Sequence, residues 1–79
     1  MSESTLEIVK AALIYQLRLD PEEVKPESLI SDDLGADSLD AVELIIALEE
    51  QLNITIDEGD AEKLRTVADV AELIDKLSS

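Results

Sequence analysis

The sequence predicts an all-α fold, a small bundle of three longer helices plus one short helix, with a long loop between the first two long helices. Apolar residues recur with helical spacing in three separate segments, and capping patterns stand at the start of each segment. A strand is conceivable at 53–56, but the sequence offers it no partner strand, so we reject that alternative. Because 79 residues leave no room for a second core, we treat 1–79 as a single domain.

The first predicted helix begins at a capping box. Ser4 and Glu7 form the Ser-x-x-Glu pattern that satisfies the free backbone N–H groups at a helix start. The apolar residues that recur on one face of this helix are Leu6, Val9, Leu13 and Leu17. We expect the helix to end near Arg18 or Leu19.

The segment between the first two long helices is predicted to be an ordered loop. Residues 20–23 combine a cap, a proline and two acids, a pattern typical of one short helical turn. From Lys25 to Ala36 the chain is interrupted by Pro26 and Gly35. Three apolar residues are expected to pin this loop to the core: Leu29, Ile30 and Leu34. A loop of about twelve residues is longer than most connections, which indicates a functional role.

The second helix is predicted to begin at Asp37 or Ser38 and to end near 52–53. The residues that face the core at 100° per residue are Ala41, Leu44, Ile45, Leu48 and Leu52. The roughly opposite side carries Leu39 and Ile46, with Val42 at its border, and shares that face with Glu43 and Glu50. An apolar patch ringed by acids favours a docking surface, although scattered surface hydrophobic residues can also lack any role.

The last third of the sequence predicts one short and one longer helix. Gly59 is interpreted as a helix breaker, and Ala61 and Leu64 suit a short helix after it. Thr66 and Asp69 repeat the capping pattern and begin the final helix. The residues expected on its buried side are Val67, Val70, Ala71, Ile74 and Leu77.

The residue types present limit the possible chemistry. The sequence has no histidine and no cysteine, so Ser–His and Cys–His catalytic arrangements cannot form, and we expect a protein that is not an enzyme. The acids lack EF-hand spacing, so we predict no firm metal site, only loose binding of divalent cations. A basic leader and an apolar run near ~18 residues are both missing, so we expect a cytoplasmic protein without a membrane span.

The charge is strongly negative and unevenly distributed. Twenty acids against six bases leave a net charge of −14, which argues against nucleic acid as a partner. From Pro26 through Glu62 there are twelve acids and no lysine or arginine. A field of this kind attracts basic protein surfaces and speeds their encounter, whereas the simpler interpretation is that the acids only maintain solubility.

Ser38 is the candidate for a modified residue. Gly35 permits a tight turn just before it, and Ser38 itself lies at the positive end of a helix, where a phosphate group is favoured. Asp37 is also a good capping residue, so one of the two is redundant for the helix. If Asp37 is the cap, the Ser38 hydroxyl is free to accept a phosphodiester. The alternative is an unmodified helical interaction module in which Ser38 is the cap.

The string DLGADSLD at 33–40 resembles the prosthetic-group motif of acyl carrier proteins, whose core is Asp-Ser-Leu. The residues VEL at 42–44 and ALEE at 47–50 also resemble that family, and the likeness covers nearly the entire chain. It implies an acyl-carrier-like bundle with 4'-phosphopantetheine on Ser38, donated from coenzyme A by a phosphopantetheinyl transferase. Asp37 then matches the residue that helps to place Mg²⁺ during the transfer, and the thiol of the arm carries acyl groups as thioesters.

The resemblance also implies partners for the second helix. The acids that match family residues meeting basic enzyme surfaces are Asp40, Glu43, Glu49 and Glu50, and the apolar centre of that patch is Leu39, Val42 and Ile46. The implied partners of this monomeric carrier are the acyl and malonyl transferases, ketoacyl synthases, reductases and dehydratases of fatty acid synthesis. Polyketide, nonribosomal peptide and other specialised acyl pathways remain alternatives. Leu29 and Leu52 stand where the family usually has phenylalanine, which would alter the cavity for the acyl chain.

Overall fold

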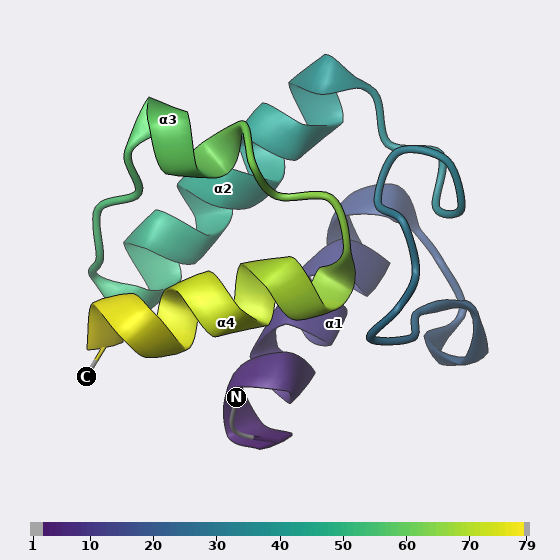
Figure 1. Cartoon of the computed structure of the whole chain (residues 1–79). Coiled ribbons are helices and arrows are strands. Elements are labelled where there is room, and N and C mark those ends of the chain that lie inside the picture. The colour runs from purple at the N-terminus through teal and green to yellow at the C-terminus, as the bar shows by residue number, and fades with distance from the viewer. Residues whose placement is uncertain (1–2, 79) are drawn as a thin grey trace.

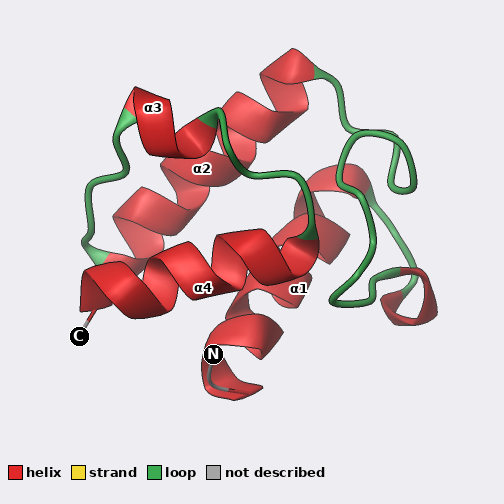
Figure 2. Ribbon diagram, viewed as in Figure 1, coloured by secondary structure: helices red, strands yellow, loops and turns green. Residues whose placement is uncertain are grey.

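The computed structural model describes residues 3–78, and every regular element in that range is helical (Figures 1 and 2). The elements are α1 (Glu3–Leu17), the 3₁₀ turn η1 (Pro21–Glu23), α2 (Ser38–Leu52), α3 (Glu58–Ala61) and α4 (Val67–Ser78). The described chain forms no strand, which confirms the predicted all-α fold with three longer helices and one short one. None of these helices has the length and apolar character needed to cross a membrane.

The two ends of α1 differ in how well the sequence predicts them. The capping box at Ser4 is wrong, because α1 already includes Glu3 and its cap position falls outside the described residues. The predicted end is confirmed: Arg18 adopts a left-handed backbone (φ 56°), and the Leu19 N–H donates to the Ile14 carbonyl at 3.1 Å. This left-handed residue closes the helix and turns the chain toward η1.

The core lies where α1, α2 and α4 meet. In Figure 1, α1 passes behind α4, and these two helices make extensive contact, as do α1 and α2. The largest fully buried side chains are Leu13, Leu48, Val9, Val24, Val67 and Val70. A hydrogen bond from the Thr5 hydroxyl to the Asp75 carboxylate further ties α1 to α4. The core is entirely aliphatic, as the composition requires, since the single aromatic residue, Tyr15, is exposed.

The loop between η1 and α2 is fastened to the segment that precedes α4. The Ile30 N–H donates to the Arg65 carbonyl at 2.9 Å, and the Val67 N–H donates to the Ser28 carbonyl at 3.1 Å. Ile30 and Leu34 are buried as predicted, but Leu29 is 36% exposed. The loop is held here by the Ile30 hydrogen bond and by an isolated bridge between Leu29 and Thr66, and the side chain that enters the core is that of Ile30 and not that of Leu29.

The short helix α3 begins earlier than the sequence predicts. Gly59 lies inside α3 and does not break it, while Leu64 follows the helix. Glycine disfavours a helix interior by only about 1 kcal/mol relative to alanine, a cost that a four-residue helix between anchored flanks can tolerate.

The predicted cap at the start of α4 is present. The Asp69 N–H donates to Thr66 Oγ1 at 3.1 Å, and the Thr66 and Arg65 N–H groups both donate to Asp69 Oδ2 at 3.1 Å. The backbone hydrogen bond from Thr66, together with that from Arg65, lowers the pKa of Asp69 from its ordinary value of 3.8, against the opposing effect of desolvation.

We expect Asp69→Asn to lower the free energy of unfolding by about 1 kcal/mol at pH 7, because the charged acceptor of two backbone N–H groups is lost. A depressed pKa stabilises the fold above 3.8 and loses that contribution as the pH falls through the lower folded value. Urea unfolding at pH 7 and pH 3 should therefore show the difference from wild type shrinking in acid. Glu72→Gln, at an exposed acid of the same helix, is the charge-matched control, and an equal effect of both variants would contradict the role of the cap.

Candidate functional site

The start of α2 shows which residue caps the helix. Asp37 has an extended backbone, and its Oδ1 accepts the Asp40 N–H at 2.9 Å. In return, Asp40 Oδ2 accepts the Asp37 N–H at 3.3 Å, which completes a reciprocal capping box. The cap is therefore Asp37, and Ser38 is the first residue of the helix.

The Ser38 hydroxyl is exposed and makes no hydrogen bond within the described residues. It lies at the N-terminus of a 15-residue helix, where unpaired N–H groups and the helix dipole favour an anion. Gly35 forms the turn that leads into α2. Its backbone is left-handed (φ 74°), and its N–H donates to the Ser31 carbonyl at 3.1 Å. A Cβ at this position would meet no atom within 4 Å, so Gly35 is required by its backbone angle and not by lack of space.

A cavity of about 600 Å³, open to solvent, lies beside Ser38 and is lined by the loop before α2, by α2 itself, by the segment around α3 and by α4. Its apolar lining is formed by Leu29, Ile30, Ala36, Ala41, Leu44, Ile45, Ala61, Leu64 and Val70. The polar lining residues are Ser31, Asp32, Asp37, Ser38 and Arg65. A flexible group attached to the Ser38 oxygen would therefore have an apolar compartment within reach.

The outer face of α2 carries the apolar patch that the sequence predicts. Leu39 is 65% exposed, Val42 52% and Ile46 47%, whereas Leu44 and Leu48 on the other side are buried. Exposed aliphatic side chains on one face of one helix form a candidate contact surface.

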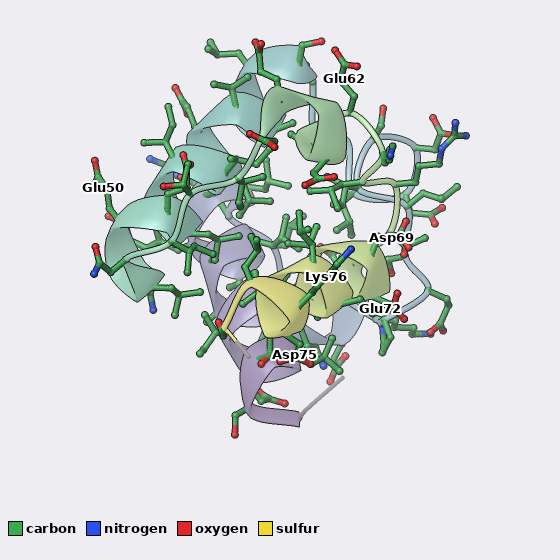
Figure 3. All side chains as sticks on the ribbon, turned by 60° about the vertical axis from the view of Figure 1, so that its left-hand side comes forward. Glu50, Glu62, Asp69, Glu72, Asp75 and Lys76 are labelled. Carbon is green, nitrogen blue, oxygen red and sulfur yellow. The ribbon has the colours of Figure 1, made fainter. Side chains whose placement is uncertain are left out.

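The four acids predicted to meet partners differ in their surroundings. Asp40 belongs to the capping box, Glu43 Oε2 accepts from Gln16 Nε2 of α1 at 2.6 Å, and Glu49 Oε2 accepts the Ile56 N–H at 2.8 Å. Glu50 is exposed, and Figure 3 shows it pointing away from the bundle near the end of α2. Sequence reasoning missed the bond of Glu49 to Ile56, since nothing in the sequence marks a contact between residues seven positions apart across a helix end.

Within residues 3–78 the many acids form no metal-binding cluster. Across the part of the chain that the structure describes, no group of three or more His, Cys, Asp or Glu side chains is arranged to hold a metal ion. The acids are instead spread along all the helices and the loops.

Comparison with known proteins gives a consistent result. Residues 7–74 match the family model described as "Phosphopantetheine attachment site". The chain is 54% identical to the acyl carrier protein of Helicobacter hepaticus over 90% of this chain and 93% of that protein. It is likewise 54% identical to the acyl carrier protein of Campylobacter jejuni, over 94% and 96%. A solved chain described as an acyl carrier protein from Mycobacterium tuberculosis superimposes with a TM-score of 0.86 at 33% identity, covering 91% of this chain and 96% of that one.

The capping geometry predicts unequal effects of two adjacent substitutions. Asp37→Ala should lower the free energy of unfolding by about 1 kcal/mol, because the Asp40 N–H loses its acceptor. Ser38→Ala should change it by less than about 0.5 kcal/mol, since no bond of the hydroxyl is lost and alanine favours helices. Thermal and urea unfolding of both variants would measure this, and a larger loss for Ser38→Ala would mean that Ser38 is the cap.

Proposed function

The chain belongs to the acyl carrier protein family, whose prosthetic group is phosphopantetheine, and we propose that it carries acyl intermediates of fatty acid synthesis as thioesters on a 4'-phosphopantetheine arm joined to Ser38. The observation that carries the proposal is the exposed Ser38 hydroxyl, which Asp37 releases from capping at the opening of an apolar cavity. The protein is then a cytoplasmic carrier and not a catalyst.

The surroundings of Ser38 suit the phosphodiester that would join the arm to the chain. The Ser38 oxygen forms a new bond to the pantetheine-bearing phosphorus of coenzyme A and gives up its proton, while the pyrophosphate bond of coenzyme A breaks and adenosine 3',5'-diphosphate leaves. The phosphodiester anion that results lies at the positive end of α2. Among the other serines, Ser28 is buried and hydrogen bonded, and Ser31 lies in the loop and not at a helix start. Asp37, next to the acceptor and exposed, is positioned to help place Mg²⁺ while a phosphopantetheinyl transferase loads the arm.

The cavity suits the cargo. Its volume of about 600 Å³ lies within the usual range for small-molecule sites, roughly 300–1,000 Å³, and most lining residues are aliphatic or alanine. A hydrocarbon chain gains about 0.8 kcal/mol for each CH₂ group moved from water into such a compartment. Shelter of this kind stabilises an apolar acyl chain between successive enzymes.

The outer face of α2 suits serial docking. Its apolar centre supplies contact area, and the surrounding acids attract basic surfaces of the loading enzyme and of the transferases, synthases, reductases and dehydratases of fatty acid synthesis. A carrier that visits several enzymes needs rapid dissociation, which a small patch with screened charges allows.

Loading is the direct test. Incubation with coenzyme A, Mg²⁺ and a phosphopantetheinyl transferase should add the mass of one phosphopantetheine, and Ser38→Ala should abolish the addition while Ser31→Ala leaves it intact. Intact-mass spectrometry measures both. Absence of any addition, or equal addition to Ser38→Ala, would overturn the proposal. Acyl groups that the native protein holds as thioesters can be released with hydroxylamine as hydroxamates, and their identity would then distinguish fatty acid from polyketide or peptide cargo.

Docking is tested on the loaded protein. Ile46→Ala and Glu43→Lys should each reduce kcat/KM for a fatty acid synthesis acyltransferase roughly tenfold, through lost apolar contact or reversed charge. Leu77→Ala and Glu72→Lys, on α4, are the matched controls and should have little effect. Leu77 was expected on the buried side of this helix, but that expectation is wrong, because its side chain is exposed near the end of the helix. Equal losses in the controls, or a melting temperature far below wild type in the α2 variants, would contradict a docking role.

A further inference from the structure

Glu49 gathers three backbone N–H groups where α2 ends. Its carbonyl oxygen accepts from Asn53, the left-handed cap residue, and from Ile54 at 3.1 Å. Its carboxylate Oε2 accepts from Ile56 at 2.8 Å. Glu49 therefore accepts hydrogen bonds from three residues of the turn between α2 and α3. The bond nearest to α3, from the Ile56 N–H, is made by the Glu49 side chain.

Ile56 precedes a part of the cavity wall in which Leu64 is the hydrophobic residue that packs against the core. Ile56 is 8% exposed and stands two residues before α3, none of whose four residues is buried. The extensive helix contacts of the bundle run between α1 and α4 and between α1 and α2, and do not include α3. Ala61 of α3 and Leu64 just after it line the cavity. The wall segment 57–64 is thus anchored by Ile56 on one side and by the start of α4 on the other.

The Glu49 carboxylate is also within reach of a docked partner. Glu49 follows Ile46 by three positions, so the two side chains are neighbours on the helix surface, and exposed Glu50 comes next in sequence. No lysine or arginine occurs from Pro26 through Glu62, so Glu49 has no basic residue among its neighbours in the sequence.

We propose that Glu49 is a latch between the docking face and the cavity. A guanidinium on a partner pairs with both carboxylate oxygens in one plane, which turns the carboxylate outward and away from the Ile56 N–H. Ile56 then loses the hydrogen bond of its backbone N–H, segment 57–64 is held less firmly at that side, and the cavity opens toward the enzyme that has docked. This inference rests on the proposed function, because it assumes that the cavity holds the cargo and that partners are basic.

The latch can be tested on the unmodified protein by amide hydrogen exchange measured by NMR. Glu49→Ala should speed exchange at Ile56 and within 57–64 on the order of tenfold or more, while amides in α1 and α4 change little. Glu49→Gln keeps an oxygen acceptor and should stay near wild type. Glu50→Ala removes the same charge one position away and should leave exchange at Ile56 unchanged.

A hexa-arginine peptide, at low ionic strength, serves as the basic probe. It should speed exchange at Ile56 in wild type and in Glu50→Ala, but not in Glu49→Gln, which keeps the acceptor and lacks the charge that draws the guanidinium. Equal acceleration throughout α1 and α4, an effect of Glu50→Ala as large as that of Glu49→Ala, or an undiminished peptide response in Glu49→Gln would each overturn the latch. None of these outcomes depends on loading of Ser38, so failure of the latch is separable from failure of the carrier function.

Discussion

The hydrogen bond from the Asp40 N–H to the Asp37 carboxylate is the interaction on which the site depends. It makes Asp37 the cap, so that α2 begins at Ser38 and the serine oxygen is not needed to cap the helix. If Ser38 were the cap, its oxygen would be engaged with the backbone, and attachment of any group there would weaken the helix that presents it. Separating the cap from the acceptor lets one be modified without disturbing the other, while both remain at the electropositive end of α2.

A chain with a net charge of −14 and an aliphatic core must limit the repulsion among its acids. Several acids do so by accepting backbone N–H groups in place of basic side chains. Asp33 accepts from Leu29 at 2.8 Å in the loop, and Asp69 accepts from Arg65 and Thr66 before α4. In these bonds a charged carboxylate fixes the local backbone by accepting N–H groups that would otherwise lack partners. The acids that remain exposed, such as Glu50, are then available for long-range attraction.

Local signals explain how much of this could be predicted from the sequence. The bounds of α2 follow from Asp37 at one end and Asn53 at the other, and helical periodicity correctly separates exposed Ile46 from buried Leu48. The errors at Gly59 and Leu29 have a common cause, because tertiary contacts of flanking residues decide both positions and leave no trace in local propensity. The cavity and the bond from Ile56 to Glu49 are likewise products of how segments meet.

The internal bonds of the α2 acids change what a docking surface on this helix can do. If all four acids projected freely into solvent, a partner would sense only charge and an apolar patch, and binding would leave the bundle unchanged. Glu43 is instead bound to α1 through Gln16, and Glu49 to the turn before α3. A base that competes for either carboxylate must therefore displace a contact within the bundle, and a ligand shifts an equilibrium only through such differential contacts. In the proposed latch, Glu49 would thereby attract an enzyme and also transmit its arrival to the cavity wall.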